Sequence, residues 1–254
     1  KYYDLVLSVL PFEPKYYNGL PVLCKYIGHP ISEDGWNSKH SKTKIKILYK
    51  IDKKSKILGV MAGSRKAEIQ RLLPTLIESI NLFYKSHKDL TVVLPAATKT
   101  TYSMIKNNIN KLNCSTKIIK MFELSEEQRI LLFKSFDAAI VKSGTSSLEL
   151  TFANIPMIVV YKMHTLSFLI LKYYFRIFEK LKYASLTNIL LKKEVIPEYI
   201  QDNYTPPKLA QGLQKLFNVK FANKQKLEYS KVVKLLSNQN NLLPSEKAAD
   251  IILK

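Results

Sequence analysis

Two short loops in this chain combine residue types that bind phosphate. Gly63, Ser64 and Arg65 follow an apolar run at 57–62 and precede a helical pattern. Glycine lets a ligand approach the backbone, serine offers a hydroxyl, the helix start offers free N–H groups, and arginine offers a planar fork that fits phosphate. A tight turn in which Ser64 only caps the helix is a simpler interpretation. The loop alone therefore indicates either an anion site or an ordinary helix start.

The second loop surrounds a glycine with small hydroxyl-bearing residues. Ser143, Gly144 and Thr145 follow the apolar run at 137–141. Hydroxyls and backbone N–H groups at a helix start favour an anion. Glu149 lies about one turn further on, where its carboxylate can accept hydrogen bonds from both hydroxyls of a ribose. The alternative is a capped helix with a first-turn glutamate that the helix dipole favours by itself.

Both loops depend on strands and helices that alternate along the chain. Apolar runs predict strands at 57–62, 90–94, 116–121, 137–141 and 157–161. The segments between them have helical spacing, and Pro74 is expected to divide the first helix into a short piece and a main one. The alternation predicts an α/β fold with a Rossmann-like parallel sheet covered on both faces. In such sheets ligands bind at the carboxyl ends of the strands, which is where both loops lie.

The flanking segments differ from this pattern. Residues 1–31 hold one strand–helix–strand unit, with strands at 4–9 and 22–27, which is too small to bury a face alone. Residues 32–56 are polar and rich in lysine, and we expect a linker or an exposed helix there. The chain beyond about residue 206 is expected to be mostly helical. Because the chain begins with Lys1 and not Met, we expect it to begin inside a longer protein.

The composition narrows the class of partner. Lysine and arginine number 40 against 20 acidic residues, a net charge of +20, which favours polyanions or reflects a codon bias toward lysine. Only four of these residues are arginines and no aromatic platform accompanies them, which argues against a nucleic-acid-binding module. Cys24 and Cys114 are expected to be buried free thiols in a reducing compartment. No signal peptide is evident, and no apolar run reaches the ~18 residues that span a bilayer.

Motifs along the whole chain resemble those of the lipid-A-disaccharide synthase family. They are Leu-Pro-Phe-Glu at 10–13, Tyr-Ile-Gly-His-Pro at 26–30, Gly-Ser-Arg-x-x-Glu-Ile at 63–69, Ser-Gly-Thr-x-x-Leu-Glu at 143–149, Pro-Met-Ile-Val-Val-Tyr-Lys-Met at 156–163 and Ser-Leu-x-Asn at 185–188. The resemblance implies a GT-B glycosyltransferase that transfers diacylglucosamine from its UDP derivative to diacylglucosamine 1-phosphate and releases UDP. It implies the UDP-sugar as donor substrate, without a metal or other cofactor.

The resemblance also divides the chain and assigns roles. Residues 1–31 correspond to the end of the N-terminal acceptor domain, 32–56 to a linker, and 57–254 to the C-terminal UDP-sugar-binding domain. Arg65 and Asn188 are implied in catalysis, and Glu149 in holding the ribose. The diphosphate is assigned to residues of both loops: Gly63, Ser64, Arg65, Ser143, Gly144 and Thr145.

Four further residues need separate interpretation. Thr187 replaces a proline that is usual in the family, and Lys142 replaces a small residue, so that it either adds a phosphate contact or is merely exposed. The general base of the family belongs to the acceptor domain. Among the carboxylates of residues 1–31, only Glu13 lies near the carboxyl end of a strand, and a helix-capping role fits it better than catalysis. A structural role also fits His29 better.

Residues 164–182 form an apolar face punctuated by basic residues. They resemble a helix at a membrane interface, although a core or dimer helix is an equal alternative. With the net charge, they predict a cytoplasmic protein, peripheral on the inner membrane, that contacts an anionic membrane surface. A homodimer or a complementary N-terminal domain are further possible partners. The alternatives for function are another GT-B transferase or a UDP-GlcNAc epimerase, and a non-catalytic remnant that binds UDP.

Overall fold

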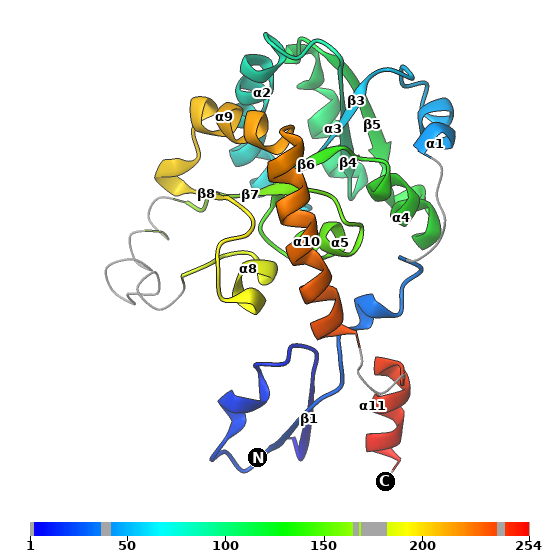
Figure 1. The fold of residues 1–254 in the computed structure, drawn as a ribbon, viewed down its shortest axis with the longest axis vertical. Coiled ribbons are helices and arrows are strands. Elements are labelled where there is room, and N and C mark those ends of the chain that lie inside the picture. Colours follow the sequence, from blue (N-terminus) through cyan, green and yellow to red (C-terminus); the bar gives the residue numbers. More distant parts are fainter. Residues whose placement is uncertain (1–2, 37–41, 165–167, 169–181, 238–241, 254) are drawn as a thin grey trace.

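A six-stranded parallel sheet organises the chain (Figure 1). The computed structural model describes residues 3–36, 42–164, 168, 182–237 and 242–253. The strands lie in the order β5-β4-β3-β6-β7-β8, and each adjacent pair is parallel. Their bounds are Lys56–Met61 for β3, Leu90–Ala96 for β4, Ser115–Lys120 for β5, Ala138–Lys142 for β6, Met157–Tyr161 for β7 and Glu198–Ile200 for β8. The predicted α/β fold with a parallel sheet is confirmed.

The strands are apolar on both faces because helices cover both. Successive residues of a strand point to opposite faces, and in β3 Leu58 packs into one hydrophobic cluster while Ile57 packs into the other. All the predicted strands of this sheet form within a few residues of their expected bounds. The three-residue β8 was not predicted, since its sequence Glu-Tyr-Ile is too short to form an apolar run.

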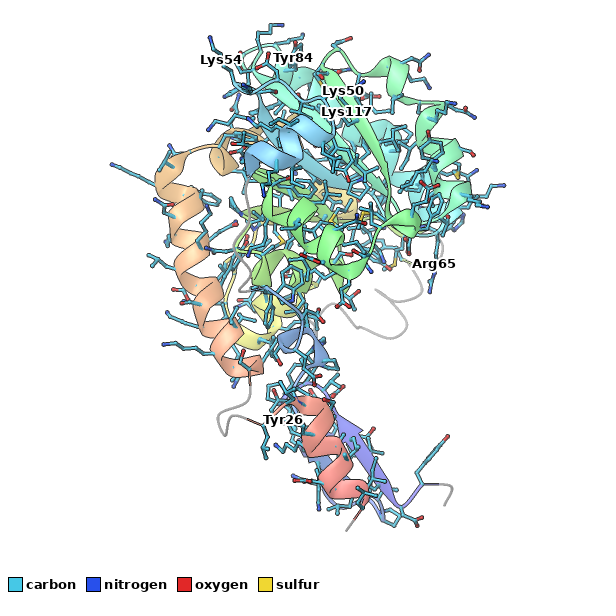
Figure 2. The ribbon with its side chains drawn as sticks, turned by 90° about the vertical axis from the view of Figure 1, so that its right-hand side faces the viewer. Tyr26, Lys50, Lys54, Arg65, Tyr84 and Lys117 are labelled. Carbon is cyan, nitrogen blue, oxygen red and sulfur yellow. The ribbon has the colours of Figure 1, made fainter. Side chains whose placement is uncertain are left out.

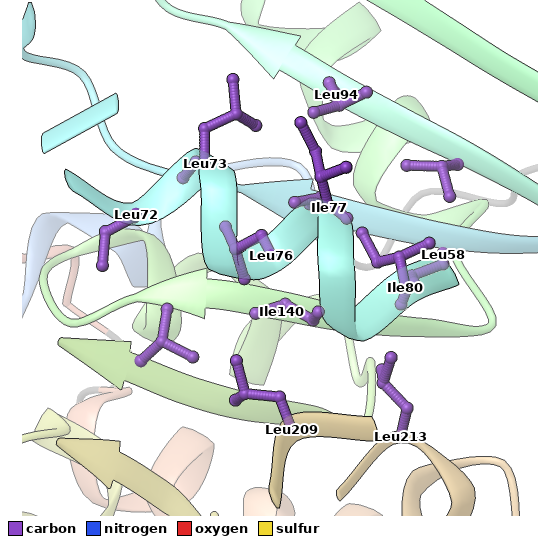
Figure 3. Packing of buried hydrophobic residues seen from close by; sticks show 14 of the residues in the cluster. Leu58, Leu72, Leu73, Leu76, Ile77, Ile80, Leu94, Ile140, Leu209 and Leu213 are labelled. Atoms are coloured by element: carbon purple, nitrogen blue, oxygen red, sulfur yellow. The ribbon is translucent and has the colours of Figure 1, made fainter. Parts of the chain in front are cut away.

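The first hydrophobic cluster lies between the sheet and three helices. Its helices are α2 (Lys66–Tyr84), α3 (Lys99–Lys106) and α9 (Pro206–Leu216). Figure 3 shows Leu76 and Ile80 of α2 near Ile140 of β6, and Leu209 and Leu213 of the neighbouring helix α9 belong to the same cluster. The spacing of these residues follows the 3.6-residue period of a helix, which is why the sequence predicts α2.

Pro74 does not divide α2, so the expected break is wrong. The helix is continuous from Lys66 to Tyr84 with the proline inside it. A proline at this position costs one backbone hydrogen bond, to the carbonyl of Gln70. The deeply buried side chains on either side, Leu73 and Leu76 among them, pack into the first cluster and offset that loss.

The second hydrophobic cluster covers the other face of the sheet. Its helices are α1 (Lys42–Leu48), α4 (Glu126–Lys134), α5 (Ser146–Phe152), α8 (Leu186–Leu191) and α10 (Val219–Leu236). Helix α10 runs along α5 and α8 in Figure 1. A capping box begins α4: Ser125 Oγ accepts from Gln128 N at 3.3 Å, and Gln128 Oε1 accepts from Ser125 N at 2.9 Å.

The lysine-rich stretch at 32–56 contributes to the second cluster. Trp36, Ile45 and Ile51 are buried there. The ammonium of Lys46 is buried as well, and it donates to the carbonyls of Lys53 at 2.6 Å and Ser55 at 2.7 Å. The stretch is thus anchored to the core of the main sheet, and its role as a linker between domains stays a prediction.

A second, two-stranded parallel sheet lies at one end of the molecule, formed by β1 (Leu5–Ser8) and β2 (Leu23–Tyr26). The last helix, α11 (Pro244–Ile252), lies beside it, as both Figure 1 and Figure 2 show. Glu33 receives two hydrogen bonds from Ser245 at the start of α11, from the backbone N at 2.7 Å and from the hydroxyl at 2.9 Å. The carboxyl end of the chain is therefore tied to the segment that follows β2.

Three predictions concern exposure and membranes. Cys24 and Cys114 are free thiols, as expected, but both are only partly buried. The predicted interfacial helix at 164–182 lies almost wholly outside the described residues. Among the helices that the structure does describe, none combines the length and apolarity needed to cross a bilayer.

Candidate functional site

The two predicted loops lie side by side at the switch point of the sheet. Strands β3 and β6 are neighbours, but α2 leaves β3 toward one face and α5 leaves β6 toward the other. Parallel sheets bind ligands in the crevice that this divergence creates. Here the crevice is a hollow of about 170 Å³, lined by residues 63, 64 and 143–146 together with Glu68, Arg129, Lys142 and Glu149.

The first loop is already occupied by a carboxylate. Glu68 Oε2 accepts hydrogen bonds from the backbone N–H groups of Ser64 at 2.9 Å and Arg65 at 3.3 Å. The expectation of free N–H groups at this helix start is therefore wrong. Gly63 permits the contact: its φ is +119°, and a Cβ there would lie 2.4 Å from Glu68 Oε2. A residue with a side chain cannot replace this glycine without moving the carboxylate.

Lys142 holds the other oxygen of the same carboxylate. Its Nζ lies 3.1 Å from Glu68 Oε1. Burial raises the pKa of Glu68, but the Lys142 ammonium and the two loop N–H groups lower it by more, so the pKa lies below its ordinary value. The carboxylate is consequently charged at neutral pH. Lys142 is therefore only partly exposed and forms an ion pair, and its side chain lines the hollow.

The second loop is open. Within the part of the chain that the structure describes, the N–H groups of Gly144, Thr145 and Ser146 make no hydrogen bond. The hydroxyls of Thr145 and Ser146 are equally unpaired among those residues, whereas Ser143 Oγ donates to the Ala184 carbonyl at 2.8 Å. Three N–H donors therefore remain for an anion in the hollow.

Glu149 lies on the lining of the hollow, as the ribose assignment requires. Its Oε1 accepts a hydrogen bond from Arg129 Nη2 of helix α4 at 3.2 Å. Arg129 Nε is buried and has no hydrogen-bond partner among the described residues. The arginine fixes one oxygen of the carboxylate and leaves the other for a ligand.

Arg65 lies beside the hollow and not in it. Its side chain is exposed, and it lines a neighbouring depression with Arg71 and Lys162. Glu68 and Lys142 line both depressions, so their ion pair separates Arg65 from the main hollow. Figure 2 shows Arg65 far from Lys50 and Lys54, which precede β3, as expected for a residue that follows the same strand.

The structure does not place Asn188 on the lining of the hollow, and its expected role in catalysis stays a prediction. Its side chain is fully buried and makes four hydrogen bonds. Nδ2 donates to the Ile196 carbonyl and to Glu198 Oε1, both at 2.8 Å. Oδ1 accepts from the N–H groups of Val195 at 2.8 Å and Ile196 at 2.9 Å. This geometry fits a positioning residue.

The network around Asn188 reaches the second loop. Glu198 also accepts from the N–H groups of Ala184 at 2.7 Å and Ser185 at 2.9 Å. The Ala184 carbonyl in turn holds Ser143 Oγ. Thr187, which stands where the family has proline, is buried and shares a 2.8 Å hydrogen bond with Thr151 of α5. This hydrogen bond ties the segment to α5.

Glu13 and His29 both make local structural contacts, but the side chain of Glu13 does not cap the 3₁₀ helix that follows it, so the expected capping role is wrong. Glu13 Oε2 accepts from the N–H of Leu10 at 3.0 Å and closes the turn after β1. His29 Nδ1 accepts from the N–H of Ile31 at 3.1 Å at the start of a 3₁₀ turn. Burial lowers the pKa of His29, although the nearby Glu13 charge opposes the shift. The described residues contain no group of three or more His, Cys, Asp or Glu side chains that can hold a metal ion.

Two charged residues of the hollow, Glu68 and Arg129, were not identified from the sequence, and Lys142 was considered only as a possible phosphate contact. Glu68 belongs to the Gly-Ser-Arg-x-x-Glu motif, and its position three residues after Arg65 is a capping-box signal. Lys142 was noticed without a partner. Arg129 gave no signal, because its contact with Glu149 depends on how α4 packs against α5.

The chain is similar to known proteins along almost its whole length. Residues 1–252 match the family model described as lipid-A-disaccharide synthetase. The lipid-A-disaccharide synthase of Rickettsia felis is 38% identical over 251 residues, which are 98% of this chain and 61% of that protein. The Rickettsia canadensis enzyme is 38% identical over 253 residues, covering 99% and 62%. The chain therefore spans about 61% of the length of these relatives.

Solved structures of glycosyltransferases share the fold. WaaG, a glycosyltransferase involved in lipopolysaccharide biosynthesis, superimposes with a TM-score of 0.56 at 12% identity, over 97% of this chain and 62% of that one. An E. coli trehalose-6-phosphate protein bound with UDP-2-fluoro glucose gives 0.59 at 12% identity, over 98% and 60%. The expected likeness to GT-B glycosyltransferases is confirmed at the level of fold. The sequence matches go further, and the chain belongs to the lipid-A-disaccharide synthase family.

Proposed function

We propose that the hollow between β3 and β6 binds the UDP part of a UDP-sugar donor. The observation that carries the proposal is the meeting of the two loops at the switch point. There the second loop's N–H groups have no partner among the described residues, and Glu149 lies on the lining. A nucleoside diphosphate needs an anion site for the phosphates and a hydrogen-bond acceptor for the ribose hydroxyls. The hollow offers both within one small volume.

Each side chain has a distinct task in this proposal. The N–H groups of Gly144, Thr145 and Ser146 receive the diphosphate, and Glu149, held by Arg129, receives the ribose. Negative charge grows on the diphosphate as the sugar leaves it, so fixed donors that face it lower the barrier. Arg65 borders the site and adds charge to it. We expect these donors to bind the diphosphate without a metal ion.

The full reaction of the family is a further part of the proposal. In it, diacylglucosamine passes from UDP-diacylglucosamine to diacylglucosamine 1-phosphate, forming a β-1,6 disaccharide in lipid A biosynthesis. The chain covers about 61% of the length of a relative, and the described residues include one sheet of six strands and one of two strands. We propose that this part provides the donor site, and that a complementary N-terminal domain provides the acceptor site and the general base. The acylated substrates imply contact with a membrane surface, to which the net charge of +20 contributes.

Calorimetry tests the donor site directly. The chain is titrated with UDP and with uridine, each in buffer with a chelator and without added metal. We expect UDP to bind in the micromolar-to-millimolar range and uridine to bind at least about tenfold more weakly, because it lacks the phosphates. Absence of UDP binding, or binding that the chelator abolishes, would contradict the proposal.

A turnover assay separates the transferase from a non-catalytic UDP-binding protein. The chain is incubated with donor, acceptor and detergent, alone and with a complementary N-terminal fragment. We expect disaccharide only in the second case, since positioning of the acceptor is worth ~7–11 kcal/mol at ideal geometry. UDP binding without turnover in either case would favour the non-catalytic alternative. Synthesis by the chain alone would place the base within it, with Glu13 the first carboxylate to replace.

A further inference from the structure

The carboxylate of Glu68 occupies the position of a bound anion in the first loop. Its Oε2 accepts from the N–H groups of Ser64 at 2.9 Å and Arg65 at 3.3 Å, while Oε1 lies 3.1 Å from Lys142 Nζ. Two N–H groups at a helix start and one ammonium form a donor set that binds phosphate oxygens as readily as a carboxylate. The carboxylate of the chain itself thus occupies donors that are suited to an anionic ligand.

We propose that Glu68 is an internal placeholder for the diphosphate, and that Lys142 is a diphosphate-binding residue that exchanges partners when the ligand arrives. In the exchange, the diphosphate oxygens accept from Lys142 and from the N–H groups of Ser64 and Arg65, and the Glu68 side chain turns away. The inference rests on the proposed function, because it names how the same donor site is filled and emptied.

The exchange needs only side-chain rotation. Glu68 lies in the first turn of α2, and its side chain is 17% exposed beside that of Lys142 at 24%. Both side chains line the hollow, so a ligand can reach them from it. The carboxylate lies against the loop because Gly63 has no side chain. The backbone of the loop therefore presents the same N–H groups before and after Glu68 leaves.

The ion pair also separates two depressions that one ligand needs to reach. Glu68 and Lys142 line both the main hollow and the depression that contains Arg65 and Arg71. When Glu68 turns away, no carboxylate stands between Arg65 and the hollow. The placeholder explains why Arg65 lies outside the hollow in the protein without ligand, although the loop that carries Arg65 borders the hollow.

Substitution of the two partners separates the placeholder from a simple helix cap. Glu68→Gln keeps the length and the capping ability, because glutamine serves at this position of a capping box. It removes the charge that competes with the ligand, so affinity for a diphosphate rises. Lys142→Met keeps an apolar stem of similar length and removes the ammonium, so affinity falls. A role limited to capping predicts no gain from Glu68→Gln.

Calorimetry of the 254-residue chain with inorganic pyrophosphate, UDP and uridine measures both effects. We expect Lys142→Met to weaken pyrophosphate and UDP binding about tenfold, as for the loss of one charge-assisted hydrogen bond. Glu68→Gln is expected to tighten both about threefold or more, and neither variant changes uridine binding. Lys54→Met is the matched control, because Lys54 is an exposed lysine before β3, far from Arg65 in Figure 2. Thermal unfolding verifies that each variant is folded.

Two results would overturn the inference. One is pyrophosphate binding by a stably folded Glu68→Gln protein that is unchanged or weaker. The other is equal affinity of Lys142→Met and Lys54→Met for pyrophosphate. Pyrophosphate binding that follows the expected pattern without any UDP binding would refute the uridine-nucleotide function and still support the placeholder. Failure of the unmodified chain to bind either ligand would overturn both.

Discussion

Asn188→Ala distinguishes a positioning residue from a catalytic one. The substitution removes a side chain that is fully buried and that makes four hydrogen bonds. It leaves the N–H groups of Val195 and Ile196 without their acceptor, and Glu198 without one of its donors. A buried polar group that loses its partner costs about 1–3 kcal/mol, because it has also lost water.

The magnitude follows from these contacts. Three of the bonds join neutral groups, at about 1 kcal/mol each, and the bond to Glu198 is charge-assisted, at about 1.5–3 kcal/mol. Water that enters the space recovers part of this sum. We expect Asn188→Ala to lower the free energy of unfolding by about 3–4 kcal/mol. Glu198 keeps its bonds to the N–H groups of Ala184 and Ser185, so the path to Ser143 persists.

Urea denaturation followed by circular dichroism measures the stability, and calorimetry below the transition measures UDP affinity. We expect the folded Asn188→Ala protein to bind UDP within about threefold of the unmodified chain, or about 0.65 kcal/mol. Asn113→Ala, which truncates an exposed asparagine, is the control and stays within about 0.5 kcal/mol. An unchanged stability together with lost UDP binding would refute the positioning role and return Asn188 to the ligand.

Two other predictions concern stability. Gly59→Ala is expected to lower the free energy of unfolding by about 1–3 kcal/mol, because its Cβ would lie 2.3 Å from the buried ring of Phe136. Gly35→Ala meets no atom within 4 Å and serves as the control in the same urea titration. Burial, and to a smaller extent the neighbouring Glu126, raise the pKa of Asp34 to about 6. The contribution of Asp34 to the free energy of unfolding is therefore greatest near pH 4, and it is lost as the pH rises through 6. We therefore expect Asp34→Asn to raise the free energy of unfolding by about 1 kcal/mol at pH 8, after allowance for solvent screening, and to leave it unchanged at pH 4. An equal increase at both pH values would contradict this.

The sequence predicted the main sheet because its strands are buried on both faces. Such strands appear as continuous apolar runs, and Met157–Tyr161 matches its predicted bounds. Two features depend on tertiary contacts: one strand was not predicted, and the predicted break in α2 was wrong. The strand Glu198–Ile200 is placed by pairing with β7, and α2 continues through Pro74 because packing outweighs one lost hydrogen bond.

The sequence predicted some residues of the candidate site but not how they come together. The two loops could be identified because each follows a buried strand with glycine and hydroxyl residues. That they share one hollow depends on the pairing of β3 with β6, which no local pattern encodes. Arg129 was missed for the same reason. Asn188 was assigned to catalysis by family resemblance, and only the contacts of its side chain reveal a buried residue with every hydrogen-bonding group in use.

A shift of one residue in the position of a glutamate accounts for the difference between the two loops. Arg65 caps α2, so Glu68 is the third residue of the helix, from which its side chain reaches back to the loop N–H groups. Thr145 caps α5, where the third residue is Leu148 and Glu149 is the fourth. One further residue turns the side chain about 100° around the helix axis, away from the loop and toward Arg129. One helix start is therefore closed by its own carboxylate while the other stays open, although the two loops have similar compositions.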